Sequence, residues 1–275
     1  MIGAVIGDFV GSIYEWHNIK TTDFPFFSPA CRFTDDSVMS IAVAEALMNG
    51  TDMAASLRKY GRLYPRAGYG GRFLQWLQDD GAGDYGSFGN GSAMRASAAG
   101  WIASTLEEAL ALAQLSAIPT HSHPEGVRGA QVAAGCIWLL RNGADKQQLR
   151  NWVVSQGYAL DFTMDEIRPD YQFDVTCQGS VPQAIEAFLE AADFESAVRL
   201  AVSIGGDSDT IASIAGALAE AYWGVPEELT AHVVSCMPKN LYLPLAAFEA
   251  KYARPIPALQ CCSCDICKTF RNLET

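Results

Sequence analysis

The chain has 275 residues, of which 49% are hydrophobic, and a formal net charge of −12 at pH 7. This length can bury a large core, the composition is that of a globular protein, and the negative charge argues against a nucleic-acid backbone as the main partner. No stretch approaches the roughly 18 unbroken apolar residues of a membrane helix, and the start lacks the basic region of a signal peptide. We therefore expect a cytoplasmic protein with no membrane partner, and a monomer.

Helical periodicity dominates the chain, whereas alternating strand-like runs are almost absent. The spacing of apolar residues predicts helices over 38–48, 53–60, 106–117, 126–141, 146–155, 181–192, 194–203, 211–223 and 229–235. Glycine-rich joints at 68–71, 81–91 and 205–206 separate some of these helices and would let backbone amides approach a ligand closely. No linker divides the chain, so we predict an all-α fold in which residues 1–255 form one compact domain of many packed helices.

Two acidic clusters far apart in the chain each open an apolar helical run. They consist of Thr34, Asp35 and Asp36, and of Asp207, Asp209 and Thr210. Such side chains in a first helical turn can simply cap the helix. Two clusters of the same type, with no lysine beside either, instead indicate a cation site, because hard oxygen ligands suit Mg²⁺ or Mn²⁺ better than zinc. The pairing predicts a binuclear metal centre, in which Asp209 is the candidate to bridge both ions.

The N-terminal region carries two further carboxylates and a group of aromatic residues. Asp8 and Glu15 lie seven residues apart, so they would share one face of a helix. We interpret Asp8 as a structural cap rather than a metal ligand. Phe24, Phe26 and Phe27 precede the first acidic cluster, where they could form a mobile lid or a packed loop.

Three polar residues in the middle of the chain have two interpretations each. His121 and His123 stand just before Pro124, where they can contact a ligand or form a local hydrogen-bonded cap. Arg95 can pair with a phosphate, or form a buried ion pair that braces the loop at Asn90.

The eight cysteines fall into two groups. Cys31, Cys136, Cys177 and Cys236 are predicted to be reduced core residues rather than disulfides. The others, Cys261, Cys262, Cys264 and Cys267, crowd into a cysteine-rich tail over residues 256–275. Their spacing could hold zinc or part of an iron–sulfur cluster, but the second half of a zinc-ribbon pattern is missing, so the role of the tail stays open.

Five motifs, taken in order, resemble the ADP-ribosylglycohydrolase family, which includes the enzyme that reactivates dinitrogenase reductase. They are GDFVGSIYE at 7–15, FTDDS at 33–37, GNGSAMR at 89–95, THSHP at 120–124 and SIGGDSDT at 203–210. The resemblance runs from about Gly3 to Trp223. It departs from the family at residues 97–99, where many members have a proline after the Met-Arg pair.

The resemblance implies an all-α fold with two Mg²⁺ or Mn²⁺ ions at the bottom of a cleft that holds ADP-ribose. The implied metal ligands are Thr34, Asp35, Asp36, Asp207, Asp209 and Thr210. Glu15 matches a family glutamate near the metals, and Glu15 and Asp36 are the candidates for catalytic proton relay. The positions implied to contact the phosphates and riboses of the ligand are Gly70, Gly71, Gly89, Asn90, Gly91, Ser92 and His121.

The predicted function is therefore metal-dependent hydrolysis of the ribosyl C1″ glycosidic bond in ADP-ribosylated protein side chains or small ADP-ribosyl compounds. This bond breaks through an oxocarbenium-like transition state and needs an activated water, which bound divalent cations help to supply. Arginine, serine, nucleic-acid base and free-metabolite linkages present the same ADP-ribose, so the linkage stays open.

Two other functions compete with this prediction. A non-catalytic, ADP-ribose-binding or crystallin-like relative would share the fold, but the presence of all six ligand positions and of Glu15 favours an enzyme. A phosphatase of the haloacid-dehalogenase type would also contain two aspartates spaced like Asp207 and Asp209. That motif needs a preceding β-strand and a threonine where Ile211 stands, so we reject it.

Overall fold

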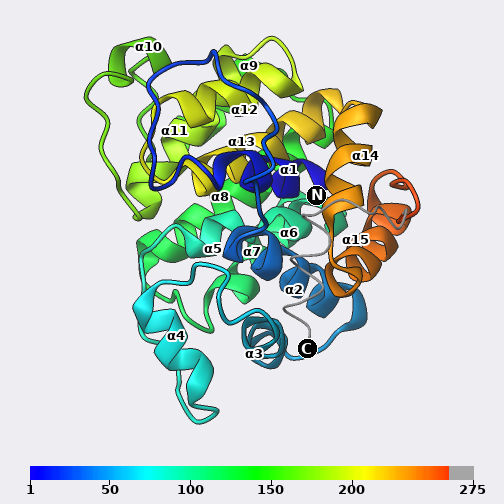
Figure 1. Cartoon of the computed structure of the whole chain (residues 1–275). Helices are drawn as coiled ribbons and strands as arrows, with labels where there is room; N and C mark the ends of the chain where they lie inside the picture. The colour runs from blue at the N-terminus through cyan, green and yellow to red at the C-terminus, as the bar shows by residue number, and fades with distance from the viewer. Residues whose placement is uncertain (260–275) are drawn as a thin grey trace.

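The structure is a computed structural model that describes residues 1–259. This part of the chain folds into fifteen α-helices, and its only β-type pairing is an isolated bridge between Gly89 and Thr176. Figure 1 shows the helices gathered into one compact body. The prediction of a single all-α domain is confirmed, while the tail cysteines at 261, 262, 264 and 267 lie outside the described residues.

The helices alternate with short loops along the whole described chain. In order they are α1 (Ile2–Gly11), α2 (Asp35–Asn49), α3 (Met53–Leu63), α4 (Gly71–Gln78), α5 (Gly91–Met94), α6 (Ser97–Ile102), α7 (Leu106–Ala117), α8 (Pro124–Arg141), α9 (Lys146–Ser155), α10 (Met164–Ile167), α11 (Cys177–Glu190), α12 (Phe194–Ser203), α13 (Ser208–Trp223), α14 (Glu227–Cys236) and α15 (Lys239–Tyr252).

The sequence pattern predicted the bounds of α7, α9 and α12 and missed other elements. Helix α11 begins at Cys177, earlier than predicted, because the side chain of Thr176 accepts a hydrogen bond from the amide of Gly179 and caps the helix. The pattern also missed α1, α4, α5, α6, α10 and α15. In α1 every residue is buried, so no polar face marks it as an amphipathic helix.

Helices α1 and α13 form the centre of the body, where α13 also packs against α8, α11 and α12 (Figure 1). The two central helices run antiparallel, and Gly3, Gly7 and Gly11 place one side of α1 directly on the backbone of α13. A Cβ atom at Gly7 would overlap the carbonyl of Ala212, and one at Gly11 would lie 2.5 Å from the Cα atom of Asp209. This close approach brings the end of α1 to the start of α13.

Other predicted features of the core are present in the described residues. The side chains of Cys31, Cys136, Cys177 and Cys236 are buried, and no disulfide joins cysteines within residues 1–259. Phe24 and Phe26 are also buried, with the guanidinium of Arg199 over both rings, which supports the packed loop rather than the mobile lid. No helix among the described residues has the length and apolarity needed to cross a membrane.

The contact between α1 and α13 generates a first prediction. Gly7→Ala should lower the free energy of unfolding by about 3 kcal/mol, because the added methyl group meets backbone that cannot rotate away. Urea unfolding followed by circular dichroism measures this change. Gly83→Ala is the matched control, since no atom lies within 4 Å of its Cβ position and its stability should change by less than about 0.5 kcal/mol. Equal stability of the two variants would contradict direct backbone contact.

Candidate metal centre and cleft

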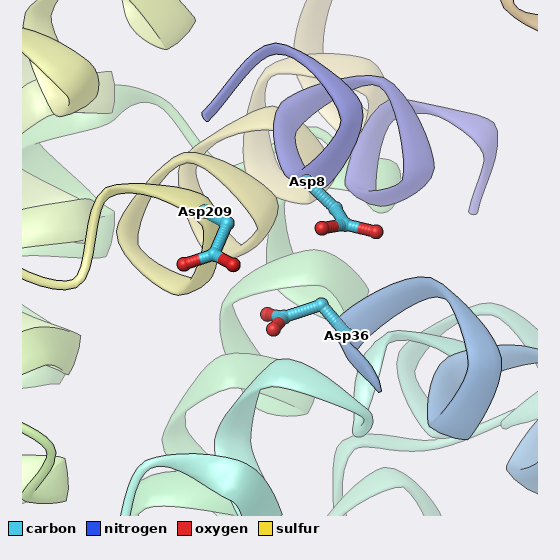
Figure 2. A group of neighbouring side chains, drawn as sticks. All are labelled: Asp8, Asp36 and Asp209. Carbon is cyan, nitrogen blue, oxygen red and sulfur yellow. The ribbon is translucent and has the colours of Figure 1, made fainter. Parts of the chain in front are cut away.

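Carboxylates from three helices converge on one point in the core. Figure 2 shows Asp8 from α1, Asp36 from α2 and Asp209 from α13 pointing toward one another. Each offers an oxygen atom, and these oxygens lie within 4.8 Å of one another. Glu15, Asp207 and Asp209 form a second such group, so Asp209 belongs to both. The structure thus brings together the two acidic clusters that are far apart in the sequence.

Burial makes this concentration of negative charge unfavourable. Burial is the main cause that raises the pKa values of Asp8 and Glu15 to about 7, and the charge of Asp209 is the second cause. The same two causes, in the same order, raise the pKa values of Asp35, Asp36 and Asp207 well above the ordinary range. The ion pairs found within residues 1–259 include none of these carboxylates. No ion pair among these residues therefore offsets the charge of the cluster, although the charge of Arg32 lowers the pKa of Glu15.

The ligand atoms of this cluster fit a hard divalent cation. The Oδ2 atom of Asp36 accepts a hydrogen bond from the hydroxyl of Thr210 (3.2 Å), and it lies 3.4 Å from the hydroxyl of Thr34, which donates to Asp8. Its Oδ1 atom is buried without a hydrogen-bond partner among the described residues. An unpaired buried carboxylate oxygen is unfavourable unless a cation binds it, and sets of carboxylate and hydroxyl oxygens suit Mg²⁺, Mn²⁺ or Ca²⁺. These residues could therefore hold a metal ion.

Asp8 caps the helix that carries Asp36. Its carboxylate accepts hydrogen bonds from the backbone amides of Thr34 (3.0 Å) and Ser37 (3.1 Å), and from the hydroxyls of both residues. Negative charge at a helix N-terminus is stabilising, so Asp8 fixes the first turn of α2 from a different helix. This agrees with the interpretation of Asp8 as a structural cap, and it also places Asp8 in the first carboxylate group.

The local structure that places Glu15 in the cluster was not predicted from the sequence. Helix α1 ends at Gly11, so the expectation that Asp8 and Glu15 share a helix face is wrong. Glu15 instead lies in the following turn, where the side-chain amide of Asn18 donates to its carbonyl oxygen (2.8 Å). Asn18 also bonds both the amide (2.8 Å) and the carbonyl (3.1 Å) of Gly206. One asparagine therefore ties the Glu15 turn to the loop before α13, where Gly205 and Gly206 have positive φ.

A cleft of about 500 Å³ opens above the carboxylates. Most of the predicted site residues line it: Glu15, Asp35, Asp36, Gly70, Gly71, Gly89, Asn90, Gly91, His121, Asp207, Asp209 and Thr210. Two do not. The hydroxyl of Thr34 donates to Asp8 (2.6 Å), and that of Ser92 donates to the carbonyl of Gly126 (2.7 Å), so both point into the protein. Several other residues that line the cleft were not predicted from the sequence, among them Trp16, Arg72, Tyr85, Phe173 and Val175.

Asn90 connects the glycine-rich loop at 89–91 to the carboxylate cluster. Its side-chain amide donates to Asp207 (2.6 Å) and to the hydroxyl of Ser180 (2.8 Å). His121 packs against the same loop, because a Cβ atom at Gly91 would lie 3.4 Å from its Nε2 atom. Burial, and then the charge of Arg95, hold the pKa of His121 well below its usual value, so the ring is neutral. Asn90 and His121 therefore offer polar contacts without adding charge.

The remaining two residues with open interpretations both make structural hydrogen bonds, and Arg95 also lines the cleft. The Nδ1 atom of His123 accepts a hydrogen bond from the amide of Glu125 (3.1 Å) and caps α8. Arg95 is buried, and its guanidinium donates to the carbonyl of Ser116 (2.9 Å) and the hydroxyl of Thr120 (2.9 Å). It therefore braces the turn before His121, and the expected ion pair at the Asn90 loop is absent from the described residues.

Known proteins resemble this chain over most of its length. A family model described as ADP-ribosylglycohydrolase matches residues 1–251. The chain is 27% identical to the ADP-ribosylhydrolase ARH3 of Homo sapiens over an alignment of 317 residues, which covers 86% of this chain and 87% of the relative. It is 28% identical over 276 residues to the ADP-ribosylarginine hydrolase Tri1 of Pseudomonas putida (strain GB-1), covering 82% of this chain and 70% of that protein.

A solved structure shares the fold. It is described as an ADP-ribosylglycohydrolase-related protein complex and superposes with a TM-score of 0.66 at 24% identity, covering 90% of this chain and 95% of that one. The family match extends over nearly the whole chain and includes every carboxylate of the cluster. The protein belongs to the ADP-ribosylglycohydrolase family.

Proposed function

We propose that this protein is a divalent-cation-dependent hydrolase that cleaves the ribosyl C1″ bond of ADP-ribosylated side chains or small ADP-ribosyl compounds. The observation that carries the proposal is the position of Asp209, which is shared by two groups of three carboxylates, all of which except Asp8 line the cleft. The names of the relatives, an ADP-ribosylhydrolase and an ADP-ribosylarginine hydrolase, support the reaction class.

Two Mg²⁺ or Mn²⁺ ions fit the charge of this cluster. The residues that would hold them are Asp36, Asp209 and Thr210 with Asp35 and Asp207, while Thr34 and Asp8 fix the turn that presents Asp36. Asp8 lies close enough to contribute an oxygen itself. When bound, such ions would offset the buried charge, chelate ribose hydroxyls and lower the pKa of a bound water.

The reaction adds one water molecule across the glycosidic bond. The water oxygen bonds to C1″, the bond from C1″ to the leaving nitrogen or oxygen breaks, and the leaving atom gains a proton. Glu15 is the candidate to take the proton from the water and return it to the leaving group. Its carboxylate lines the cleft and belongs to the second carboxylate group, which places it beside the cations and the water that they would bind.

The glycine-rich side of the cleft is suited to the diphosphate of the ligand. Gly71 and Gly91 begin α4 and α5, so unpaired backbone amides lie at this part of the lining. The neutral ring of His121 lies beside the loop at 89–91. The carboxylate end, with any cations bound there, would thus bind the ribose that carries C1″, and the amide-rich end would bind the diphosphate.

The substrate prediction separates an enzyme from a non-catalytic relative. At least one of arginine-, serine- and nucleobase-linked ADP-ribosyl substrates should be hydrolysed with Mg²⁺ or Mn²⁺, and EDTA should abolish turnover. Free ADP-ribose should bind with micromolar affinity, on the order of −8 kcal/mol, and more weakly after EDTA treatment. Absence of turnover with either ion, despite ADP-ribose binding, would favour the non-catalytic alternative.

The metal prediction follows from the raised pKa values. Since the pKa values of Asp8 and Glu15 are about 7, the cation-free cluster keeps protons at neutral pH. Binding of Mn²⁺ should displace these protons, so calorimetry in buffers of different ionisation enthalpy should detect proton release, and affinity should rise between roughly pH 6 and pH 8.

A pair of aspartate variants tests whether the carboxylate cluster is the metal centre. Asp209→Ala removes the shared carboxylate, so it should lose one or both ions and the thermal stabilisation that Mn²⁺ provides. Asp161→Ala changes an exposed aspartate outside the cleft and should titrate like the wild type. An unchanged titration in Asp209→Ala would remove the cluster from consideration as the metal centre.

The catalytic prediction concerns Glu15. If it transfers protons, Glu15→Gln should keep ADP-ribose affinity and metal occupancy while kcat falls by roughly 10²- to 10⁴-fold. If it is mainly a ligand, one ion should bind more weakly, and excess Mn²⁺ should partly restore the rate. Glu107→Gln, an exposed position on α7, is the control. Full activity of Glu15→Gln would exclude both roles and leave Asp36 as the candidate base.

A further inference from the structure

Two exposed aromatic side chains from different loops stack at the mouth of the cleft. The rings of Trp16 and Phe173 have centroids 5.4 Å apart and an interplanar angle of 25°. Trp16 is 70% exposed and Phe173 is 43% exposed, although both line the cleft. Large exposed aromatic surface beside a binding site favours a ligand that covers it.

The stacked pair lies at the carboxylate end of the cleft. Trp16 follows Glu15 directly, and a hydrogen bond from its side chain is among the interactions that lower the pKa of Glu15. Phe173 belongs to the loop whose Tyr171 ring packs on Gly206, so that a Cβ atom there would overlap the ring. Gly206 immediately precedes Asp207. Both aromatic residues are therefore anchored beside the second carboxylate group, and the loop of Phe173 continues into the bridge between Thr176 and Gly89.

Hydrogen bonds hold the two loops in this arrangement. The ammonium group of Lys20 donates to the carbonyls of Tyr171 (2.7 Å) and Ile204 (2.5 Å). The hydroxyl of Tyr171 donates to the carbonyl of Gly179 (2.5 Å), and Asn18 ties the Glu15 turn to Gly206. The aromatic platform is thus preorganised, which lowers the entropy lost when a ligand binds.

We propose that Trp16 and Phe173 form the platform for the leaving group and select a planar cationic one, the guanidinium of an ADP-ribosylated arginine. This inference rests on the proposed function, which puts C1″ beside the carboxylates, so that its substituent must leave past Trp16. A guanidinium stacks on aromatic faces and gains cation–π attraction, which is strongest on tryptophan.

The surrounding charge favours the same leaving group. The whole chain carries a net charge of −12, so a cationic side chain is attracted at long range, even where bound divalent cations would offset the charge of Glu15 and Asp207. A serine linkage has no planar group and would gain little from the platform. A neutral nucleobase would stack but would lack the electrostatic attraction.

The test compares Trp16→Ala with the wild type on arginine-linked and serine-linked ADP-ribosyl peptides. For the arginine substrate kcat/KM should fall by about 5- to 30-fold, mainly through KM, because one cation–π contact is lost. The Kd of free ADP-ribose should stay within about two-fold, and Trp16→Phe, which keeps an aromatic face but loses the hydrogen bond to Glu15, should retain the preference for the arginine over the serine substrate. Phe173→Ala should repeat the pattern more weakly, whereas Tyr222→Ala, an exposed aromatic outside this cleft, should change nothing.

Each outcome decides between the inference and its alternatives. Equal losses for arginine, serine and neutral base linkages, or a matching loss of ADP-ribose affinity, would overturn the platform as a selector of guanidinium. A wild-type enzyme that hydrolyses the serine or base linkage but not the arginine linkage would also overturn it while leaving the proposed function intact. A wild-type protein that hydrolyses none of these substrates would overturn the proposed function itself.

Discussion

The direct contact between the backbones of α1 and α13 is the constraint on which the site depends. Gly3, Gly7 and Gly11 remove every side chain that would hold the two helices apart, and the antiparallel arrangement sets the end of α1 against the start of α13. Asp8 is thereby placed beside Asp209. From that position Asp8 also accepts hydrogen bonds from backbone amides at the first turn of α2. One helix therefore positions the acidic ends of two others. A larger residue at these glycines would separate the carboxylates as well as loosen the core.

The buried carboxylates are tolerated because backbone and hydroxyl groups offset part of their charge. The clusters occupy the first turns of α2 and α13, where unpaired amides and the helix dipole favour negative charge. Hydroxyls of Thr34, Ser37 and Thr210 donate to Asp8 and Asp36. This compensation is incomplete, since burial and mutual repulsion still raise the pKa values of these groups. The remaining repulsion favours the binding of protons there, and a divalent cation would have to displace those protons.

The sequence allowed the acidic clusters to be placed correctly because hydroxyl and carboxylate residues before an apolar run are a local signal of a helix start. Prediction from the sequence failed where residues meet only in the tertiary structure, or where a helix has no amphipathic periodicity. Helix α1 is buried all round, and only the glycine spacing of four residues could have indicated it. Glu15 was expected on that helix but reaches the site through a turn held by Asn18, a single loop residue without a motif. Trp16 and Phe173 meet across two loops, a pairing that no local pattern encodes.

The cleft has two parts. Helices position the carboxylates, and loops position the aromatic platform. The carboxylates stand on helix ends fixed by backbone contact, where a small displacement would alter every distance in the cluster. Trp16 and Phe173 stand on loops and are exposed, so substitutions there would alter the mouth of the cleft without disturbing the core. Hydrolases that remove the same ADP-ribose from different side chains need the same reacting groups. They differ in how they recognise the leaving group. Separating the two on helices and loops lets the linkage preference change while the reacting groups keep their positions.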